Sequence, residues 1–298
     1  MKIKYIKIWL PLLLLMVISC KTKKQEETFN PANAKRIVSV SKQLTEMMFA
    51  LGKGKDIVAC DLTSSYPDSA KLLPKVGYHR LLSTEGIVSM RPDIVIYSQN
   101  IGPVTVIPQL QQVGVRCKEF FESNTLDSAQ LLLNALGNYF GVSAVADSLN
   151  HQLQQQMQVV YAAQKQCVDT PKVMVIQFGQ ANNVYFVMSG RNSPADAMIR
   201  MAMGKPAVYQ AKGASQLSAE AIAAANPDII IVTDFGFEKL GGIEGVKKLP
   251  GVALTNAAKK SNIYRFNEHD IVYFGPRSAG NILSLMKIFH PNIHATLP

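Results

Sequence analysis

Several sequence signatures are absent from this 298-residue chain, and each absence excludes a class of protein. The chain has four cysteines but no Cys-x-x-Cys pair, which excludes a zinc ribbon, a thioredoxin-type motif and covalent attachment of a c-type haem. It contains no Gly-x-Ser-x-Gly, His-Glu-x-x-His or Gly-x-x-x-x-Gly-Lys-Ser/Thr sequence, so these enzyme motifs are missing. Charged residues make up only 17% and hydrophobic residues 48%, which is not the composition of a disordered chain.

Acidic residues are scarce relative to basic ones. Asp and Glu number 21 against 31 Lys and Arg, which gives a net charge of +10 and an isoelectric point near 9.4. A surplus of this size favours an anionic partner, such as a membrane surface, a nucleic acid or an acidic small molecule. The N-terminus decides among these.

The first 19 residues have the pattern of a secretion signal. Lys2, Lys4 and Lys7 precede an apolar run from residue 8 to residue 18, which is shorter than the roughly 20 residues that span a bilayer. The run ends in Val-Ile-Ser-Cys20, which resembles the bacterial lipobox. We therefore expect residues 1–19 to be removed, Cys20 to receive lipid, and residues 20–34 to form a polar tether. The alternative is an ordinary signal peptide whose cleavage site holds a cysteine.

Export sets the compartment and narrows the partners. We expect a periplasmic protein held at a membrane by its N-terminal lipid, with no nucleic-acid partner. Residues 1–19 hold three lysines and no acid, so the charge without them is still +7. Cys60, Cys117 and Cys167 remain. They allow at most one disulfide, and buried thiols are the alternative.

The sequence repeats itself once. Residues 82–99 (LSTEGIVSMRPDIVIYSQ) align without gaps with residues 217–234 (LSAEAIAAANPDIIIVTD), and 8 of 18 positions are identical. Each copy predicts a helix capped by Ser, with an acid in its first turn, followed by Pro-Asp and a β-branched strand. Apolar strands at 36–40 and 172–176 repeat at nearly the same offset. Two copies at one offset indicate two similar lobes.

Each lobe alternates short apolar strands with helices, which is typical of parallel sheets with crossover helices. We therefore expect an α/β fold with two similar Rossmann-like lobes at residues 35–141 and 169–298, and a ligand cleft between them. Strands are predicted near 36–40, 57–60, 94–98, 113–117, 172–178, 184–188, 229–233 and 262–266. Helices are predicted near 43–51, 84–91, 126–140, 194–203, 219–225 and 277–289.

The segment between the lobes, residues 142–168, predicts one bridging helix. Its apolar residues recur at helical spacing with no Gly or Pro from Ser143, the expected N-cap, to Gln166. The apolar positions are Val145, Leu149, Leu153, Met157 and Val160. A continuous helix between the lobes should permit only small hinge motion.

A lipoprotein with this organisation resembles the substrate-binding proteins of ABC importers for vitamin B12, iron-siderophores and haem, over about residues 35–291. Four stretches make it most similar to the haem-uptake group. They are Arg36-Ile-Val-Ser with Thr45-Glu46 and Ala50-Leu51-Gly52; Leu73-Pro-Lys-Val-Gly-Tyr-His-Arg-Leu-Leu-Ser-Thr-Glu-Gly86; Ala195-Asp-Ala-Met-Ile199; and Phe274-Gly-Pro-Arg277. The resemblance implies that the protein binds haem as a transported ligand, has no catalytic cofactor, and delivers haem to a permease dimer and its ATPase.

Tyr78 and Arg80 are the first candidate haem-binding residues. They precede a capped helix on the side of the lobe where parallel sheets bind ligands. A phenolate suits ferric iron, and Tyr serves as an axial ligand in some haem proteins. A free phenol has a pKa near 10, so coordination by Tyr78 needs the iron, helped by a cation such as Arg80. In an extended segment residues 78 and 80 point the same way and His79 points away. The alternatives are His79 as the ligand, or a Tyr packed on the lobe edge beside a solvated Arg.

The second lobe offers further candidates. The resemblance places Arg277 opposite Tyr78, where it would bind the phenolate or a propionate; otherwise it is a surface Arg at a helix start. Tyr273 would supply a second ligand or stack on the porphyrin, and His269 is an equivalent candidate.

Glu85 and Glu220 are the acids that the repeat relates. In the superfamily, acids at the related positions meet arginines on the two membrane subunits, and one acid per lobe suits a two-fold partner. The alternative is ordinary complementation of a helix dipole.

These patterns predict a haem-binding lipoprotein that catalyses nothing. A ferric siderophore or a cobalamin is the alternative cargo. An exported metal-dependent enzyme is the alternative of another class, and it would need a cluster of metal ligands. The five histidines, at positions 79, 151, 269, 290 and 294, do not form one in the sequence.

Overall fold

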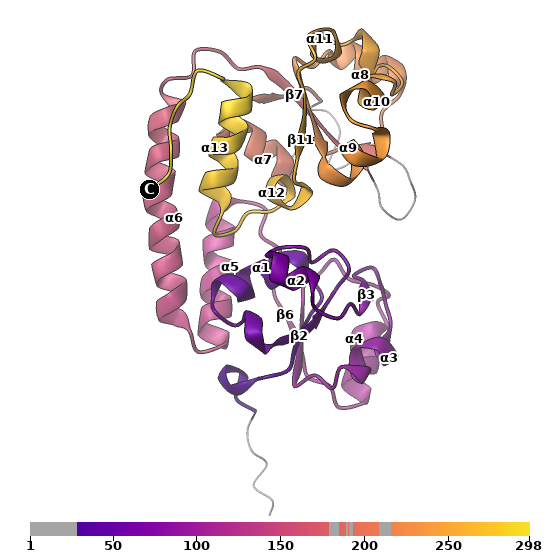
Figure 1. The fold of residues 1–298 in the computed structure, drawn as a ribbon. Helices are drawn as coiled ribbons and strands as arrows, with labels where there is room; N and C mark the ends of the chain where they lie inside the picture. Colours follow the sequence, from indigo (N-terminus) through magenta and orange to yellow (C-terminus); the bar gives the residue numbers. More distant parts are fainter. Residues whose placement is uncertain (1–28, 179–184, 189, 191–192, 209–215) are drawn as a thin grey trace, which may run out of the picture. The chain divides into compact units, whose positions relative to one another are not determined.

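A computed structural model describes residues 29–178, 185–188, 190, 193–208 and 216–298. The chain divides into two units, Met1–Asn30 and Pro31–Pro298. The predicted signal peptide, Cys20 and most of the predicted tether lie outside the described residues. The second unit holds both predicted lobes and the helix between them (Figure 1). None of the helices within the described ranges is long and apolar enough to cross a membrane.

The first lobe is built on a four-stranded sheet in the order β2-β1-β5-β6, and all of its neighbours are parallel. The strands are β1 (Ile37–Ser39), β2 (Ile57–Cys60), β5 (Ile94–Tyr97) and β6 (Cys117–Glu119). The helices are α1 (Lys42–Ala50), α2 (Asp68–Lys71), α3 (Thr84–Ser89), α4 (Val106–Gln112) and α5 (Leu126–Tyr139). A two-stranded hairpin of β3 (Gly77–Tyr78) and β4 (Leu81–Leu82) precedes α3. Val38, Val95, Ile87 and Leu110 are buried together between the sheet and its helices, which is the burial that drives this lobe to fold.

The second lobe has a sheet in the order β11-β10-β7-β8, with β9 also paired to β7. The strands are β7 (Lys172–Phe178), β8 (Tyr185–Val187), β9 (Lys205–Pro206), β10 (Ile229–Thr233) and β11 (Ile263–Phe266). The helices are α7 (Pro194–Met201), α8 (Ala219–Ala225), α9 (Asp234–Leu240), α10 (Ile243–Lys247), α11 (Asn256–Lys259), α12 (Glu268–Val272) and α13 (Ser278–Phe289). β8 runs antiparallel to β7, contrary to the expectation of purely parallel sheets. The link from Phe178 to Tyr185 is too short for the crossover of a dozen or more residues that a parallel pair requires.

The repeat in the sequence appears as a repeated structural unit. Ser83 and Ser218 cap α3 and α8 by accepting hydrogen bonds from Gly86 N and Ala221 N. In each repeat a Pro-Asp pair follows the helix. The side chain of this Asp accepts a hydrogen bond from the backbone at the start of β1 or β7. Asp93 accepts hydrogen bonds from the backbone N of Lys35 and of Arg36.

Asp228 makes the corresponding bond in the second lobe, where it accepts from Lys172 N at 3.0 Å. In both lobes the strand so bound, β1 or β7, pairs in parallel with the strand that follows the Asp. The two aspartates therefore fix the register of equivalent strand pairs.

The bridging helix α6 spans Ser143–Gln164, about 33 Å at 1.5 Å per residue. It contacts α5 of the first lobe and α13 of the second, and Figure 1 shows it running beside both. Ser143 is not its N-cap as predicted: Val142 holds that position, and the Ser143 hydroxyl bonds Asn138 instead. Val145 was expected to face the core but is 41% exposed.

The first turns of α6 bury small and polar residues instead of Val145. Ala146 is fully buried there, and a Cβ added to Gly137 on α5 would lie 2.6 Å from the Ala146 Cβ. Contacts under 3.0 Å do not occur between such atoms, so the glycine is what lets α5 and α6 approach this closely. Leu153, Met157 and Val160 are buried along the rest of the helix as predicted.

Candidate functional site

The segment that holds Tyr78 is a tight hairpin and not the extended strand that the sequence suggested. Gly77 pairs with Leu82 and Tyr78 with Leu81 in antiparallel register, so residues 79 and 80 form the turn. Gly77 has a φ of +109°, a conformation that favours glycine. Because the chain reverses here, the alternation expected for residues 78–80 does not occur.

The hairpin brings His79 beside Tyr78 instead of turning it away. The two rings lie 4.4 Å apart between centroids, tilted by 59°. His79 Nδ1 lies 3.6 Å from Asp61 Oδ2, and Asp61 is fully buried. Burial by itself raises the pKa of the Asp61 carboxyl, but the nearby His79 and hydrogen bonds from Ser64 and Thr63 hold it below the ordinary value. An ionised, buried aspartate therefore lies directly behind the hairpin.

Arg80 occupies the tip of the hairpin and is exposed. The backbone of the turn is fixed to a neighbouring loop, because Gly102 N donates to His79 O and Leu82 N donates to Gly102 O, each at 2.9 Å. A side chain at position 102 would also meet Arg80 O at 2.8 Å. The structure therefore places Tyr78 and His79 together and leaves the Arg80 side chain at the surface.

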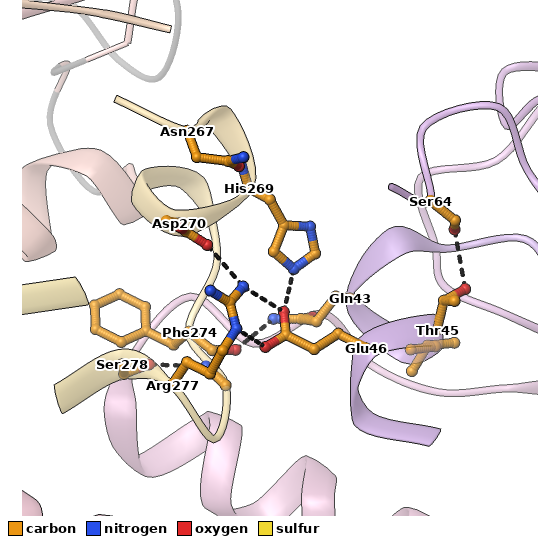
Figure 2. A network of polar contacts seen from close by, with 12 residues as sticks. Gln43, Thr45, Glu46, Ser64, Asn267, His269, Asp270, Phe274, Arg277 and Ser278 are labelled. Atoms are coloured by element: carbon orange, nitrogen blue, oxygen red, sulfur yellow. Dashed lines mark hydrogen bonds and ion pairs between the residues drawn. The ribbon is translucent and has the colours of Figure 1, made fainter. Parts of the chain in front are cut away.

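Arg277 takes part in a network of charged residues that joins the two lobes (Figure 2). Glu46 on α1 accepts from Arg277 Nε at 2.8 Å and also contacts His269 Nε2 on α12. Arg277 Nη2 lies 2.6 Å from Asp270 Oδ1. Burial by itself raises the pKa of the Glu46 carboxyl, but His269 and Arg277 hold it below the ordinary value.

Two further contacts join the same elements. Lys42 Nζ lies 2.5 Å from Glu268 Oε1, and the Gln43 amide donates to Phe274 O at 3.0 Å. The Gln43 amide also bonds the backbone and side chain of Ser123. Because α1 follows β1 and α12 follows β11, these contacts connect the carboxyl-end edges of the two sheets, where open α/β sheets bind ligands.

Tyr273 lies beside this network and is partly buried. The Lys42 Nζ lies 5.1 Å from the centroid of its ring, and its ring centroid lies 5.5 Å from that of His269. Burial raises the pKa of the Tyr273 phenol, and the Lys42 cation only partly counteracts this. Near neutral pH Tyr273 is therefore a neutral phenol that can stack or donate a hydrogen bond.

The network contains residues that the sequence patterns did not assign to the site. Glu46 served there only as part of the motifs that carry the family resemblance, and Lys42 was not a candidate. The partners lie 223 to 231 residues away in the chain for Glu46 and 226 for Lys42, so no local spacing could indicate them. The available signal was that a Lys and a Glu lie at helical spacing in a mostly apolar helix, which could have indicated a charged network on that helix.

Glu85 and Glu220 lie in the first turns of α3 and α8, and both are exposed. They occupy equivalent positions in the two lobes, one residue before the backbone N–H that each capping serine binds.

Two of the surface cavities on the described residues can be described, and neither of these two is lined by a predicted haem residue. One, of about 580 Å³, lies between α5 and α6 and includes Asp127, Asp147 and Asn150. The other, of about 240 Å³, follows β5 and includes Tyr97, Ile101 and Val104. No group of three or more His, Cys, Asp or Glu suited to a metal ion occurs within the described ranges.

Large apolar side chains are exposed on the ligand-binding edge of the first lobe. Leu62 follows β2, Phe121 follows β6, and Leu81 lies on the hairpin. These three and Tyr66 are exposed to the extent of 37–74%. Such side chains at this edge suit a large, flat and partly apolar ligand.

Comparison with known proteins identifies the family. Residues 37–269 match the periplasmic binding protein family. The chain belongs to that family. Its members are substrate-binding transport proteins, so this chain is a substrate-binding protein of the ABC-transporter superfamily. The two-lobe α/β fold predicted from the repeat is confirmed.

The solved structures that this family member resembles include two named as haem binders. It is similar to the apo form of the periplasmic heme-binding protein RhuT from Roseiflexus sp. RS-1, with a TM-score of 0.81 and 31% identity, over 87% of this chain and 98% of that one. It is also similar to a periplasmic heme-binding protein from Pseudomonas aeruginosa, with a TM-score of 0.78 and 30% identity, over 88% and 95% of the two chains.

Two sequence relatives carry other names. One is the uncharacterized ABC transporter substrate-binding lipoprotein YvrC of Bacillus subtilis, 24% identical over 87% of this chain and 81% of the relative. The other is the vitamin B12-binding protein of Vibrio cholerae, 27% identical over 57% of this chain and 64% of the relative.

Proposed function

We propose that this periplasmic binding protein is the haem-binding component of an ABC importer. It takes up ferric haem between its lobes and passes it to a permease dimer driven by an ATPase. The hairpin that presents Tyr78 on the ligand-binding edge is the observation that carries this proposal. The likeness to two proteins named as haem binders, at 30–31% identity over nearly their whole length, supports it.

Tyr78 is the proposed axial ligand of the iron. A phenolate oxygen is a hard anionic donor, and Fe³⁺ favours it over softer ligands. The Tyr78 ring lies against His79, which in turn lies against the buried Asp61. This packing restricts the rotamers of Tyr78 and so orders the donor before haem arrives.

The remaining haem contacts come from both lobes. Arg80, at the exposed tip of the hairpin, is placed to meet a propionate. Tyr273 and Arg277 approach from the second lobe, where the neutral phenol of Tyr273 can stack on the porphyrin. Leu62, Leu81 and Phe121 would cover the apolar faces of the ring.

Membrane attachment and delivery complete the proposal. Cys20 would carry the lipid that holds the protein at the membrane on the periplasmic side. Glu85 and Glu220, exposed at equivalent helix starts, would bind one subunit each of the permease dimer.

Cobalamin is the second candidate cargo. The relative from Vibrio cholerae that is named as a vitamin B12-binding protein favours it. Haem is preferred because cobalamin carries its own lower axial base and has less need of a phenolate, whereas the iron of ferric haem can take an axial phenolate from the protein.

A titration distinguishes these cargoes. Hemin is added to a chain that begins at Lys21, which keeps the whole compact unit Pro31–Pro298, and the Soret band is followed to saturation. Cobalamin and a ferric hydroxamate siderophore are titrated in parallel. Haem binding predicts one saturable Soret shift with bands typical of a ferric phenolate. Tight binding of cobalamin with no saturable hemin signal would contradict the proposal.

A further inference from the structure

The guanidinium group of Arg277 is held by Glu46 and Asp270 before any ligand is considered (Figure 2). Its Nε lies 2.8 Å from Glu46 Oε1, and its Nη2 lies 3.3 Å from Glu46 Oε2. The same Nη2 lies 2.6 Å from Asp270 Oδ1. Its central carbon lies 3.6 Å from the centroid of the Tyr66 ring, which is cation-π distance.

The hydrogen-bond donors of Arg277 can be counted. A guanidinium has five N–H groups: one on Nε and two on each terminal nitrogen. Glu46 accepts from Nε and from Nη2, and Asp270 forms an ion pair at Nη2. No hydrogen bond of the Nη1 nitrogen is found within the described part of the chain. Arg277 can therefore offer a ligand one nitrogen, and not the two-nitrogen fork that an unrestrained Arg offers.

Glu46 is itself rigidly placed. It is only 6% exposed, and its neighbour Thr45 anchors α1 by hydrogen bonds to Ser39 Oγ at 2.8 Å and Ser64 Oγ at 2.9 Å. Glu46 belongs to the first lobe and Arg277 to the second. The Glu46 carboxylate therefore fixes the position of Arg277, a residue of the second lobe, relative to the first lobe.

We propose that Glu46 is the positioning residue for Arg277: it fixes the guanidinium across the lobe boundary so that only Nη1 is presented to the haem site. This inference rests on the proposed function. It adds a rule of specificity, because one nitrogen suits a single acceptor atom, such as one propionate oxygen or a phenolate. A ligand that needs a bidentate grip on its carboxylate would not be satisfied by Arg277.

The charges of the network agree with this role. Glu46 and Asp270 carry two negative charges against the single positive charge of Arg277, so the group has no net electrostatic attraction for a distant anion. Arg277 instead contributes a hydrogen bond of defined direction, and that direction depends on the carboxylates that hold the guanidinium. Removal of Glu46 should therefore weaken binding although it removes a negative charge.

A double-mutant cycle in hemin affinity tests the proposal. Partners that orient a ligating or contacting group typically contribute about 10–100-fold to affinity. We expect Glu46→Gln to weaken hemin binding about tenfold and Arg277→Gln to do the same. The double variant should be no worse than Arg277→Gln alone, because Glu46 acts only through Arg277.

The matched control removes the neighbouring ion pair that also crosses between the lobes. Glu268→Gln breaks the contact with Lys42 without touching Arg277. If Glu46 only tied the lobes together, Glu268→Gln would couple to Arg277→Gln as strongly as Glu46→Gln does. We expect Arg277→Gln to cost the same affinity with and without Glu268→Gln.

The outcomes separate this proposal from the proposed function. Failure of the wild-type chain to bind hemin would refute the proposed function. Wild-type binding with an unchanged or tighter Glu46→Gln variant, or with additive losses in the double variant, would refute the positioning role alone. If Glu46→Gln does not fold, Glu46→Asp carries the same cycle, because it keeps the charge but withdraws the carboxylate from Nε and Nη2 of Arg277.

Discussion

The two lobes are alike where they build their sheets and different where they face a ligand. In both, a capping serine starts a short helix and an aspartate binds the start of the central strand. The six residues before Ser83 are Gly-Tyr-His-Arg-Leu-Leu, whereas the six before Ser218 are Lys-Gly-Ala-Ser-Gln-Leu. Only the first lobe places a Tyr and an Arg before its capped helix.

This difference shows how duplication and recognition are divided in the molecule. The repeated residues determine helix starts and strand register, which any ligand would require. The residues that we propose to contact the cargo lie in segments that the repeat does not preserve, namely the hairpin of the first lobe and residues 268–277 of the second. The sharpest tests therefore change one lobe and leave the other intact.

The largest expected effect is on Tyr78. Partners outside the coordination sphere cost about 10–100-fold, so loss of the iron ligand itself should cost roughly 100-fold or more in hemin affinity. Tyr78→Ala should also remove the charge-transfer bands of a ferric phenolate in the visible spectrum. Tyr273→Phe in the other lobe keeps the ring and should cost less than about tenfold.

The control for Tyr78 is its neighbour in the turn. His79→Ala should keep the charge-transfer bands, because His79 lies against Asp61. If Tyr78→Ala keeps the wild-type spectrum while His79→Ala loses it, the imidazole and not the phenolate binds the iron.

The sequence predicted the fold better than it predicted the site, for a physical reason. Helix periodicity, serine caps and β-branched runs are local, so α6, β7 and β10 were placed within a few residues of their ends. The capping of α6 by Val142 and the exposure of Val145 depend on how closely α5 approaches at Gly137, which no local pattern reports. The partners of Glu46 and Lys42 lie more than 220 residues away, so they emerge only when the lobes meet.

The second largest effect concerns stability and compares a buried acid at the lobe boundary with an exposed one. Removing one partner of a buried ion pair costs about 3–5 kcal/mol, so Glu46→Gln should lower the free energy of unfolding by about 3 kcal/mol. Glu238→Gln, which removes an ion pair to Arg265 with both side chains about half exposed or more, should cost at most about 1 kcal/mol. Urea denaturation at pH 7 measures both.

The same pair gives a pH dependence. The pKa of folded Glu46 lies below its ordinary value, while an unfolded Glu titrates near 4.3. Its contribution to stability is therefore complete above about pH 5 and is lost as the pH falls through the folded pKa. Below about pH 5 the wild type should lose stability more steeply than Glu46→Gln. Parallel curves for the two proteins would show that Glu46 titrates alike in both states.

A smaller effect compares two helical glycines, one in each lobe. Gly137→Ala would place a Cβ 2.6 Å from Ala146 Cβ, whereas Gly280→Ala on α13 would meet Leu297 Cδ1 at an ordinary 3.5 Å. We expect Gly137→Ala to destabilise by about 1–3 kcal/mol through overpacking. Gly280→Ala should stabilise by about 0.5–1 kcal/mol. The melting temperatures of the two variants test this comparison. A higher melting temperature for Gly137→Ala would mean that α6 can move away from α5 at little cost.

The smallest effect on the isolated protein is expected at Glu85 and Glu220. Both acids are exposed, so Glu85→Ala and Glu220→Ala should leave hemin affinity and the melting temperature unchanged. Each should reduce haem transfer to vesicles that contain the permease, and the double variant should reduce it most, because acids desolvated at an interface contribute more than exposed ones. Normal transport by the double variant would indicate that both acids only complement the helix dipoles. Loss of hemin binding would place them in the site.

The chain passes between the lobes once, through α6, and this order has a consequence for biogenesis. All strands of the first sheet precede α6, and all strands of the second follow it. A chain made from its N-terminus completes the first lobe early, but Glu46 acquires Arg277 only when the C-terminal segment arrives. Until then the nascent first lobe holds a carboxylate with its partners still unsynthesised. A product cut short before residue 268 would therefore keep the strands of its first sheet but lack His269 and Arg277, the partners of the buried Glu46.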